Sequence, residues 1–294
     1  MRNINNECKC YEYIDIVLNK MESEYKLDFE DACIRLLSEE IIEPKGFKSG
    51  TDWNQMVDNY PRKWDADNTN IMLALYCVLF PKIKLNKDGE GVECLKDVNI
   101  DYFGYKGRVG ETLNSFGTMC GEGSKNRRII KDKESAKHLD SLITQFSHDY
   151  HKPGNFIPFP ATLNVPPEEY ESEWGIRIHG DFFDVKLRII KEEWDDILKG
   201  TSSVGLLNRN KSFFEPFKDV GFIGFCEYFY LGDYLKSGEI EDLCDHSGNT
   251  HKYIGALPEP NDELQCSKYI NNATRIIGSR TERMANQLVC LMRE

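Results

Sequence analysis

The segment from residue 146 to residue 160, FSHDYHKPGNFIPFP, constrains the fold more than any other part of this chain. Each of its prolines fixes φ and pushes the preceding residue out of the α region, and Gly154 loses more backbone freedom on folding than other residue types do. Ordering this junction segment is therefore costly, so the fold must impose one specific shape on it. A helical pattern precedes it, and we expect a helix-to-loop junction here.

Apolar residues recur at helical spacing in several other segments. Asp28 suits an N-cap, Asp181 precedes the best-delimited pattern, and Gly200 stands where that helix should stop. The run from Ile71 to Phe80 is apolar on every face, so a central strand would also fit it, but we favour a helix. The sequence predicts helices over residues 28–41, 68–80, 135–146 and 181–200, short buried helices over 212–235, and one or two helices over 263–292.

Between residues 82 and 133 the pattern dissolves into Gly, Asp, Asn and Lys, with a strand-like piece at 98–105. The predicted fold class is mainly α: an irregular helical domain with loop-rich connections and at most a small β hairpin. No long Pro/Ser/Gly linker divides the chain, which favours a single domain over 1–294. The alternative is an N-terminal helical part over 1–110 and a core domain over 111–294 that carries the junction segment.

Charge and apolar runs restrict the partners and the location. The formal net charge of −12 repels nucleic-acid phosphates and anionic membranes, so nucleic acid could bind only through the local basic loop 125–133. The run 71–80 is too short to span a bilayer, which needs about 20 apolar residues. The N-terminus lacks the pattern of a secretory signal, and the scattered cysteines suit reduced thiols. We expect a cytoplasmic protein without membrane contact.

Histidines and aspartates on both sides of the junction are candidate metal ligands or acid/base groups, because neutral imidazole and carboxylate donate lone pairs. His151 and Asp181 are the candidate catalytic residues. Helix-end electrostatics explain the same pattern, since a helix C-terminus favours imidazolium and a helix N-terminus favours carboxylate. The candidate metal set is His148, His151, His179, Asp181 and Asp184.

Two further groups could contact a ligand. Asn155 offers a donor and an acceptor, either to a ligand or to the loop itself. The Gly-rich basic run that contains Lys125, Arg127 and Arg128 could hold phosphate, although its spacing differs from a P-loop and a solvated basic loop explains it as well.

The residues YHKPGNFIPFP, Leu163–Asn164 and Asp181–Asp184 resemble a bacterial domain-of-unknown-function family. That family carries a similar Tyr-His, Gly-Asn-Phe, Pro-x-Pro and Asp-x-Phe-Asp signature. The resemblance covers residues 140–190. It implies an intracellular bacterial protein and supplies no catalytic assignment.

Three hypotheses for the function follow, and whether the protein is an enzyme, and with which cofactor, stays open. The first is binding of a small polar or phosphorylated ligand between the helix ends at 146–160 and 177–184. The second is a metal-assisted hydrolase that uses the His/Asp set. The third is a protein-interaction module that presents Phe156 and Phe159. The ligand contacts predicted by the first are His148, His151, Asn155, Arg177, Asp181 and Asp184.

Overall fold

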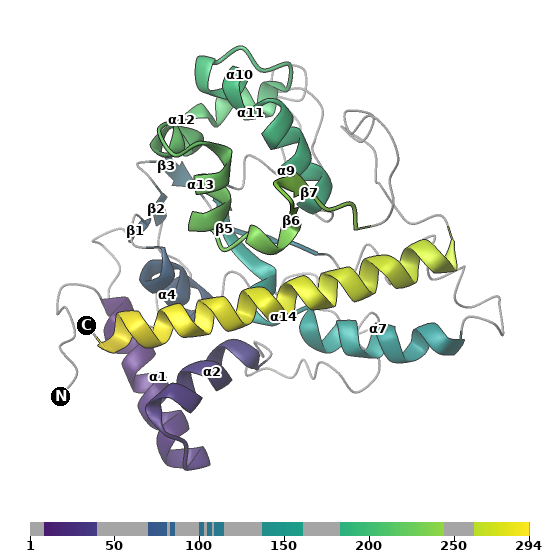
Figure 1. Ribbon diagram of the computed structural model, residues 1–294. Coiled ribbons are helices and arrows are strands. Elements are labelled where there is room, and N and C mark those ends of the chain that lie inside the picture. Colours follow the sequence, from purple (N-terminus) through teal and green to yellow (C-terminus); the bar gives the residue numbers. More distant parts are fainter. Residues whose placement is uncertain are drawn as a thin grey trace.

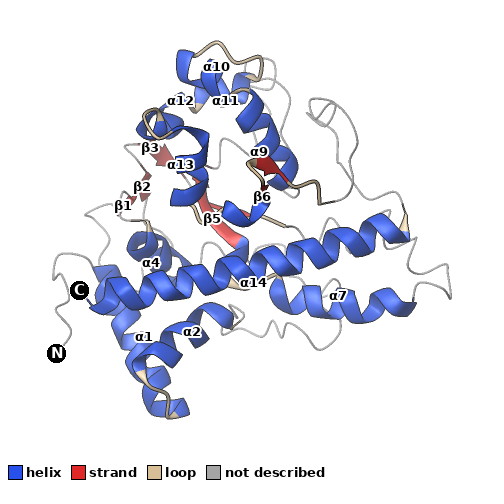
Figure 2. Cartoon of the chain, viewed as in Figure 1, coloured by secondary structure: helices blue, strands red, loops and turns tan. Residues whose placement is uncertain are grey.

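The computed structural model of the chain describes residues 9–39, 70–80, 83–85, 100–102, 105–107, 109–114, 137–160, 183–243 and 262–293. Helices predominate in these ranges, and the strands form small antiparallel sheets (Figure 2). The mainly α fold expected from the sequence is confirmed. The single-domain organisation stays a prediction.

Helices from the N-terminal part of the chain pack together at one end of the molecule (Figure 1). They are α1 (Lys9–Tyr25), α2 (Phe29–Ser38) and α4 (Asn70–Leu79). The predicted N-cap of α2 is confirmed, because the Asp28 carboxylate accepts a hydrogen bond from the Asp31 backbone N–H at 2.8 Å. The apolar run of α4 is a buried helix, as favoured over a strand. α1 lies outside the predicted helices, because its buried stripe of Cys10, Ile14 and Leu18 is too narrow to be distinctive.

The junction segment lies in the middle of the fold. α7 (Lys137–Asp149) leads into the 3-10 turn η4 (Pro153–Asn155), which continues directly into β5 (Phe156–Pro160). β5 pairs in antiparallel fashion with β4 (Val109–Thr112). The helix-to-loop junction expected from the sequence is therefore a helix-to-strand junction, and strand pairing holds its second half.

Short helices around an aromatic core follow the junction. They are α9 (Phe183–Glu192), α10 (Trp194–Lys199), α11 (Gly205–Arg209), α12 (Lys211–Phe214) and α13 (Gly221–Tyr228), with the 3-10 turns η7 (Glu215–Phe217) and η8 (Gly232–Tyr234). The stop at Gly200 is confirmed by its left-handed φ of 79°. The helix predicted before it is divided at Glu193, whose buried carboxylate accepts hydrogen bonds from Ser202 and Ser203.

Two further small antiparallel sheets occur in the described ranges. One contains β1 (Ile83–Leu85), β2 (Ile100–Tyr102) and β3 (Tyr105–Gly107), and the other is the hairpin of β6 (Leu235–Lys236) and β7 (Glu239–Ile240). β2 lies within the strand-like piece predicted at 98–105, and β3 begins at the last residue of that piece.

One long helix, α14 (Glu263–Arg293), crosses the molecule and contacts α2, α4, α7 and η4 (Figure 1). Gly278 does not interrupt it, because that residue is exposed while Ile276, Ile277 and Arg280 around it are buried. The prediction of one or two closing helices therefore resolves to a single helix. Residues far apart in the sequence meet along it, so α14 positions the junction segment.

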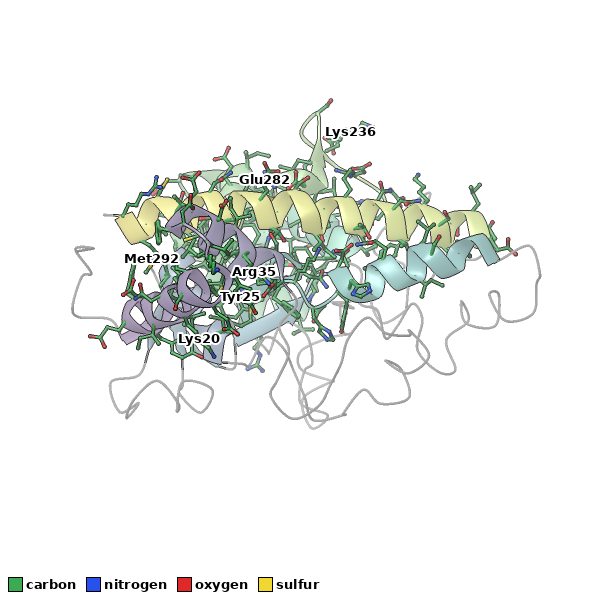
Figure 3. All side chains as sticks on the ribbon, turned by 90° about the horizontal axis from the view of Figure 1, so that it is seen from below. Lys20, Tyr25, Arg35, Lys236, Glu282 and Met292 are labelled. Carbon is green, nitrogen blue, oxygen red and sulfur yellow. The ribbon has the colours of Figure 1, made fainter. Side chains whose placement is uncertain are left out.

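The end of α14 is fastened to the N-terminal helices. Arg293 pairs with Glu30 of α2 at 3.0 Å, and Met292 is buried beside it. Figure 3 shows Met292 at this end of α14, and Tyr25 and Arg35 near each other where α1 meets α2. The Arg35 guanidinium carbon lies 3.5 Å from the centroid of the Tyr25 ring. The ion pair therefore ties α14 to α2, and the contact between Arg35 and Tyr25 joins α2 to α1.

Two expectations from composition concern these elements. Across the described ranges, no helix is long and apolar enough to cross a membrane. Six cysteines in the same ranges are thiols, and five of them are buried. Burial raises the pKa of Cys226 and Cys266 to about 12, so both stay protonated at neutral pH.

Candidate functional site

The turn η4 presses its backbone against α14. A Cβ added to Gly154 would stand 2.1 Å from Thr281 Oγ1 and 2.6 Å from the carbonyl oxygen of Ile277. Just before the turn, the Lys152 ammonium pairs with the Asp149 carboxylate at 2.6 Å. The glycine is required by this close approach, which explains part of the composition that made the segment stand out.

Asn155, a predicted ligand contact, is fully buried and bonded to the protein itself. Its Oδ1 accepts hydrogen bonds from the backbone N–H and the side-chain amide of Asn114, at 3.0 and 3.2 Å. Its Nδ2 donates to the carbonyl oxygens of Asn114 and Tyr150, at 3.0 and 2.8 Å. Both amide hydrogens are thereby used, so Asn155 braces the junction against β4.

The brace continues into a buried polar network. The Asn114 side-chain amide donates to the Tyr234 hydroxyl at 3.1 Å, and the Tyr269 hydroxyl donates to Asn114 Oδ1 at 3.5 Å. Asn114 comes from the segment after β4, Tyr234 from η8 and Tyr269 from α14. The network therefore joins three parts of the chain at the junction.

His151, a candidate catalytic residue, is 1% exposed and lies next to the ring of Tyr150. Burial lowers the pKa of His151 to about 3, so the imidazole is neutral at physiological pH and is a weak base. A general base operating near neutrality needs a pKa close to 7 and contact with its substrate. The position of His151 favours a structural role.

The buried imidazole predicts an acid-sensitive contribution to stability. In the unfolded chain histidine has a pKa of about 6.5, whereas burial lowers the pKa of native His151 to about 3. Between these two pH values the unfolded state therefore binds a proton at this residue and the native state does not. The contribution is present above pH 6.5 and is lost as pH falls toward 3. Between pH 7 and pH 5 the free energy of unfolding should fall by about 2 kcal/mol through this residue alone.

Urea denaturation of wild type and His151→Phe at both pH values measures this effect. The stability difference between wild type and the variant should shrink by that amount at pH 5, since the variant has no imidazole to protonate. His148→Gln, which alters the half-buried histidine at the end of α7, serves as the control. An unchanged difference for His151→Phe would show that the imidazole titrates normally in the fold.

The other predicted site residues are only partly located. Asp184 is fully buried in the first turn of α9, and its Oδ2 accepts a hydrogen bond from the Leu243 backbone N–H at 3.1 Å. His148 is half-buried. Within the described part of the chain, no three His, Cys, Asp or Glu side chains are grouped as a metal site. Lying outside the described residues are Arg177, His179, Asp181 and the basic-loop residues Lys125, Arg127 and Arg128.

The aromatic residues of the junction segment belong to the core. Phe156 is 1% exposed and Phe159 is fully buried, with the Phe159 ring centroid 4.8 Å from that of Phe213 and 5.9 Å from that of Phe183. Neither ring is presented to a partner, so the interaction-module hypothesis loses the surface on which it depended.

Arg280 of α14, which sequence reasoning missed, is the most unusual side chain at the junction because it is a fully buried cation. Its Nη1 donates to the carbonyl oxygens of Gly154 and Phe156, both at 2.7 Å, and its Nε donates to that of Phe229 at 3.2 Å. Burial lowers the pKa of Arg280 to about 10, although nearby tyrosine hydroxyls act in the opposite direction. The guanidinium therefore remains charged at neutral pH.

A signal for Arg280 does exist in the sequence. Ile277, Arg280 and Met284 follow one another at helical spacing, so the arginine falls on the apolar stripe of the terminal helix. A charged residue on such a stripe is rarely buried without a partner. What the periodicity does not provide is the identity of the partner.

Comparison with known proteins adds a family match. The model of a family of unknown function (DUF6994) matches residues 51–284. The matched range includes the junction segment, Asn114 and Arg280, and it excludes α1 and α2. No curated protein and no solved structure matches the chain. The resemblance to a domain-of-unknown-function family is confirmed, whereas the signature and the bacterial origin stay predictions.

Proposed function

The chain belongs to the family of unknown function DUF6994, and we propose that it binds a small organic anion through the guanidinium group of Arg280. This proposal keeps the ligand-binding hypothesis made from the sequence and changes the residue that contacts the ligand. The ligand remains small and polar, and the site remains at the junction segment, but the contact comes from α14 and not from His151 or Asn155.

The uncompensated charge of Arg280 carries the proposal. Among the residues that the structure describes, no carboxylate lies within ion-pair distance of Arg280, and its Nη2 has no hydrogen-bond partner. Burying a charge without a partner costs several kcal/mol, roughly, which is why buried charges are normally paired. An anionic ligand at Nη2 would supply both the missing countercharge and the missing acceptors.

A purely structural role accounts for only part of this arrangement. Arginine has five N–H donors, and the bonds to the carbonyls of Gly154, Phe156 and Phe229 use three of them. These bonds hold the guanidinium in a fixed orientation and fasten the junction to α14. These three bonds do not use the two N–H groups on Nη2, and a ligand would bind to those two groups.

The other arginines of α14 show how the same helix treats cations with a structural role. Arg275 pairs with Glu241 at 2.5 Å, Arg283 with Asp233, and Arg293 with Glu30 at 3.0 Å. Each is at least partly exposed, and each has a carboxylate. Arg280 departs from both features, which supports a separate role for it.

Ligand binding is tested by thermal unfolding of the purified chain with sodium acetate, benzoate or phosphate at constant ionic strength. At least one anion should raise the midpoint in a concentration-dependent way, as mass action requires for a ligand of the native state. Arg280→Met, which keeps the volume and removes the charge, should abolish the rise.

Arg275→Met is the matched control, because it removes an exposed arginine from the same helix. It should keep the full response to the anion. Absence of any response in the wild-type chain would overturn the proposal without recourse to variants, so the test holds even if Arg280→Met does not fold. A response that survives in a folded Arg280→Met would overturn it equally.

A further inference from the structure

We infer that the anion bound at Arg280 is an aromatic carboxylate that contacts the guanidinium through Nη2 alone, and not a phosphate. This inference rests on the proposed function and names its ligand class. It combines the donors that Arg280 has left with the side chains that surround it.

The donor geometry of Arg280 excludes a two-pronged contact. Arginine grips carboxylate or phosphate in bidentate fashion through neighbouring nitrogens, either Nε with Nη2 or Nη1 with Nη2. Nε is committed to Phe229, and both hydrogens of Nη1 are committed to Gly154 and Phe156. In each of these two pairs one nitrogen, Nε or Nη1, already bonds to the protein. Only Nη2 is therefore available to a ligand.

A single nitrogen suits a carboxylate better than a phosphate. A phosphate monoester group carries nearly two charges and three strong acceptor oxygens, and inorganic phosphate has one oxygen more, all of which need partners when water is excluded. At a fully buried guanidinium with one available nitrogen, most of those acceptors would remain unsatisfied, at a large cost in desolvation. A carboxylate has one charge to neutralise and fewer acceptors to satisfy.

Three tyrosines, from α4, the residues after α13, and η8, act electrostatically on the guanidinium of Arg280. The hydroxyls of Tyr76, Tyr230 and Tyr234 are close enough to Arg280 to influence its pKa. The ring of Phe80 joins two of them, with its centroid 6.3 Å from that of Tyr76 and 5.7 Å from that of Tyr230. A planar aromatic ligand would find ring partners here, and offset or edge-to-face ring contacts are favourable.

Tyr230 provides the connection to solvent. Of these three tyrosines, Tyr76 and Tyr234 are fully buried, whereas Tyr230 is half-buried. Among these three tyrosines, Tyr230 is therefore the one that a ligand entering from solvent could contact first.

The backbone of Tyr230 has a conformation that is uncommon for a residue with a side chain. Tyr230 follows α13 with a φ of 56°, its N–H bonds to the Glu227 carbonyl at 3.1 Å, and the next N–H, of Leu231, bonds to the Cys226 carbonyl at 2.7 Å. This is a Schellman motif, in which glycine usually occupies the left-handed position. A tyrosine is strained in that conformation, and such strain clusters at binding and active sites.

Binding constants for benzoate, acetate and phosphate, measured by isothermal titration of the full chain, test the inference. Benzoate should bind about tenfold more tightly than acetate and phosphate, the ratio expected from one good ring contact. Tyr230→Gly should weaken benzoate binding about tenfold and so erase its advantage over acetate. This variant suits the left-handed backbone, so it should fold.

The possible outcomes distinguish failure of the inferred ligand class from failure of anion binding at Arg280. Phosphate binding as tightly as benzoate, or a benzoate advantage that survives Tyr230→Gly, would overturn the ligand class while leaving anion binding at Arg280 intact. If none of the three anions binds, or if Arg280→Met binds them as wild type does, the proposed function itself fails.

Discussion

Gly154→Ala should lower the free energy of unfolding by about 3 kcal/mol, the upper part of the range for an overpacked site. The added methyl group would stand 2.1 Å from Thr281 Oγ1 and 2.6 Å from the Ile277 carbonyl oxygen. The hydroxyl belongs to a side chain, but the carbonyl belongs to the backbone of α14 and has little freedom to move. The turn must therefore separate from the helix or the helix must deform. Urea denaturation followed by far-ultraviolet circular dichroism measures the loss.

Gly278→Ala is the matched control for this prediction. Gly278 is an exposed glycine of α14, and an added Cβ would meet nothing within 4 Å. Alanine is the better helix former, so the free energy of unfolding of this variant should be about 1 kcal/mol higher than that of wild type. Thr281→Ala combined with Gly154→Ala should recover part of the loss, because it removes the hydroxyl contact and leaves the Ile277 contact in place. A Gly154→Ala protein as stable as wild type would show that η4 does not press on α14.

The elements that were predicted correctly depend on neighbouring residues. The start of α2 is specified by Asp28, whose carboxylate caps an N–H three residues away. The stop after α10 is specified by Gly200, which alone takes the left-handed conformation without strain. Capping and left-handed glycine are local effects, so a short stretch of sequence contains the whole signal.

The features that were missed depend on residues far apart in the chain. Arg280 bonds to the carbonyl of Gly154, 126 positions earlier, and Asn155 bonds to Asn114, 41 positions earlier. The sequence predicts that Asn155 bonds either to a ligand or to its own loop, but the choice depends on Asn114, which lies where the pattern is irregular. Periodicity identifies which face of α14 is buried and not what that face meets.

Asn155→Ala should be more damaging than Gly154→Ala, with a loss of about 4 kcal/mol. The substitution removes four hydrogen bonds from a fully buried position. It leaves the Asn114 amide, the Asn114 backbone and the Tyr150 carbonyl with fewer partners, and each buried polar group left unsatisfied costs about 1 to 3 kcal/mol. Loss of the brace should also loosen β5 from β4, which amide hydrogen exchange at Leu113 would detect, because its N–H bonds to the Asn155 carbonyl at 2.8 Å.

Asn155→Asp separates the hydrogen bonds from the shape of the side chain. The aspartate has nearly the same volume, but it places an oxygen where Nδ2 donated to the carbonyls of Asn114 and Tyr150. Burial and these carbonyls should raise the pKa of the new carboxyl above its value in the unfolded chain. A group whose folded pKa is raised stabilises the fold less as pH increases, so the deficit in stability relative to wild type should be largest at pH 7 and should shrink toward pH 4.

Asn208→Asp is the comparison, because Asn208 makes the same paired contact with the Ser202 backbone at a half-buried position. Its deficit should be smaller, since water can reach the new charge. Equal deficits at the two positions would mean that the Asn114–Asn155 pair is no more shielded than a surface loop, and the junction would then lack the buried brace on which its shape depends.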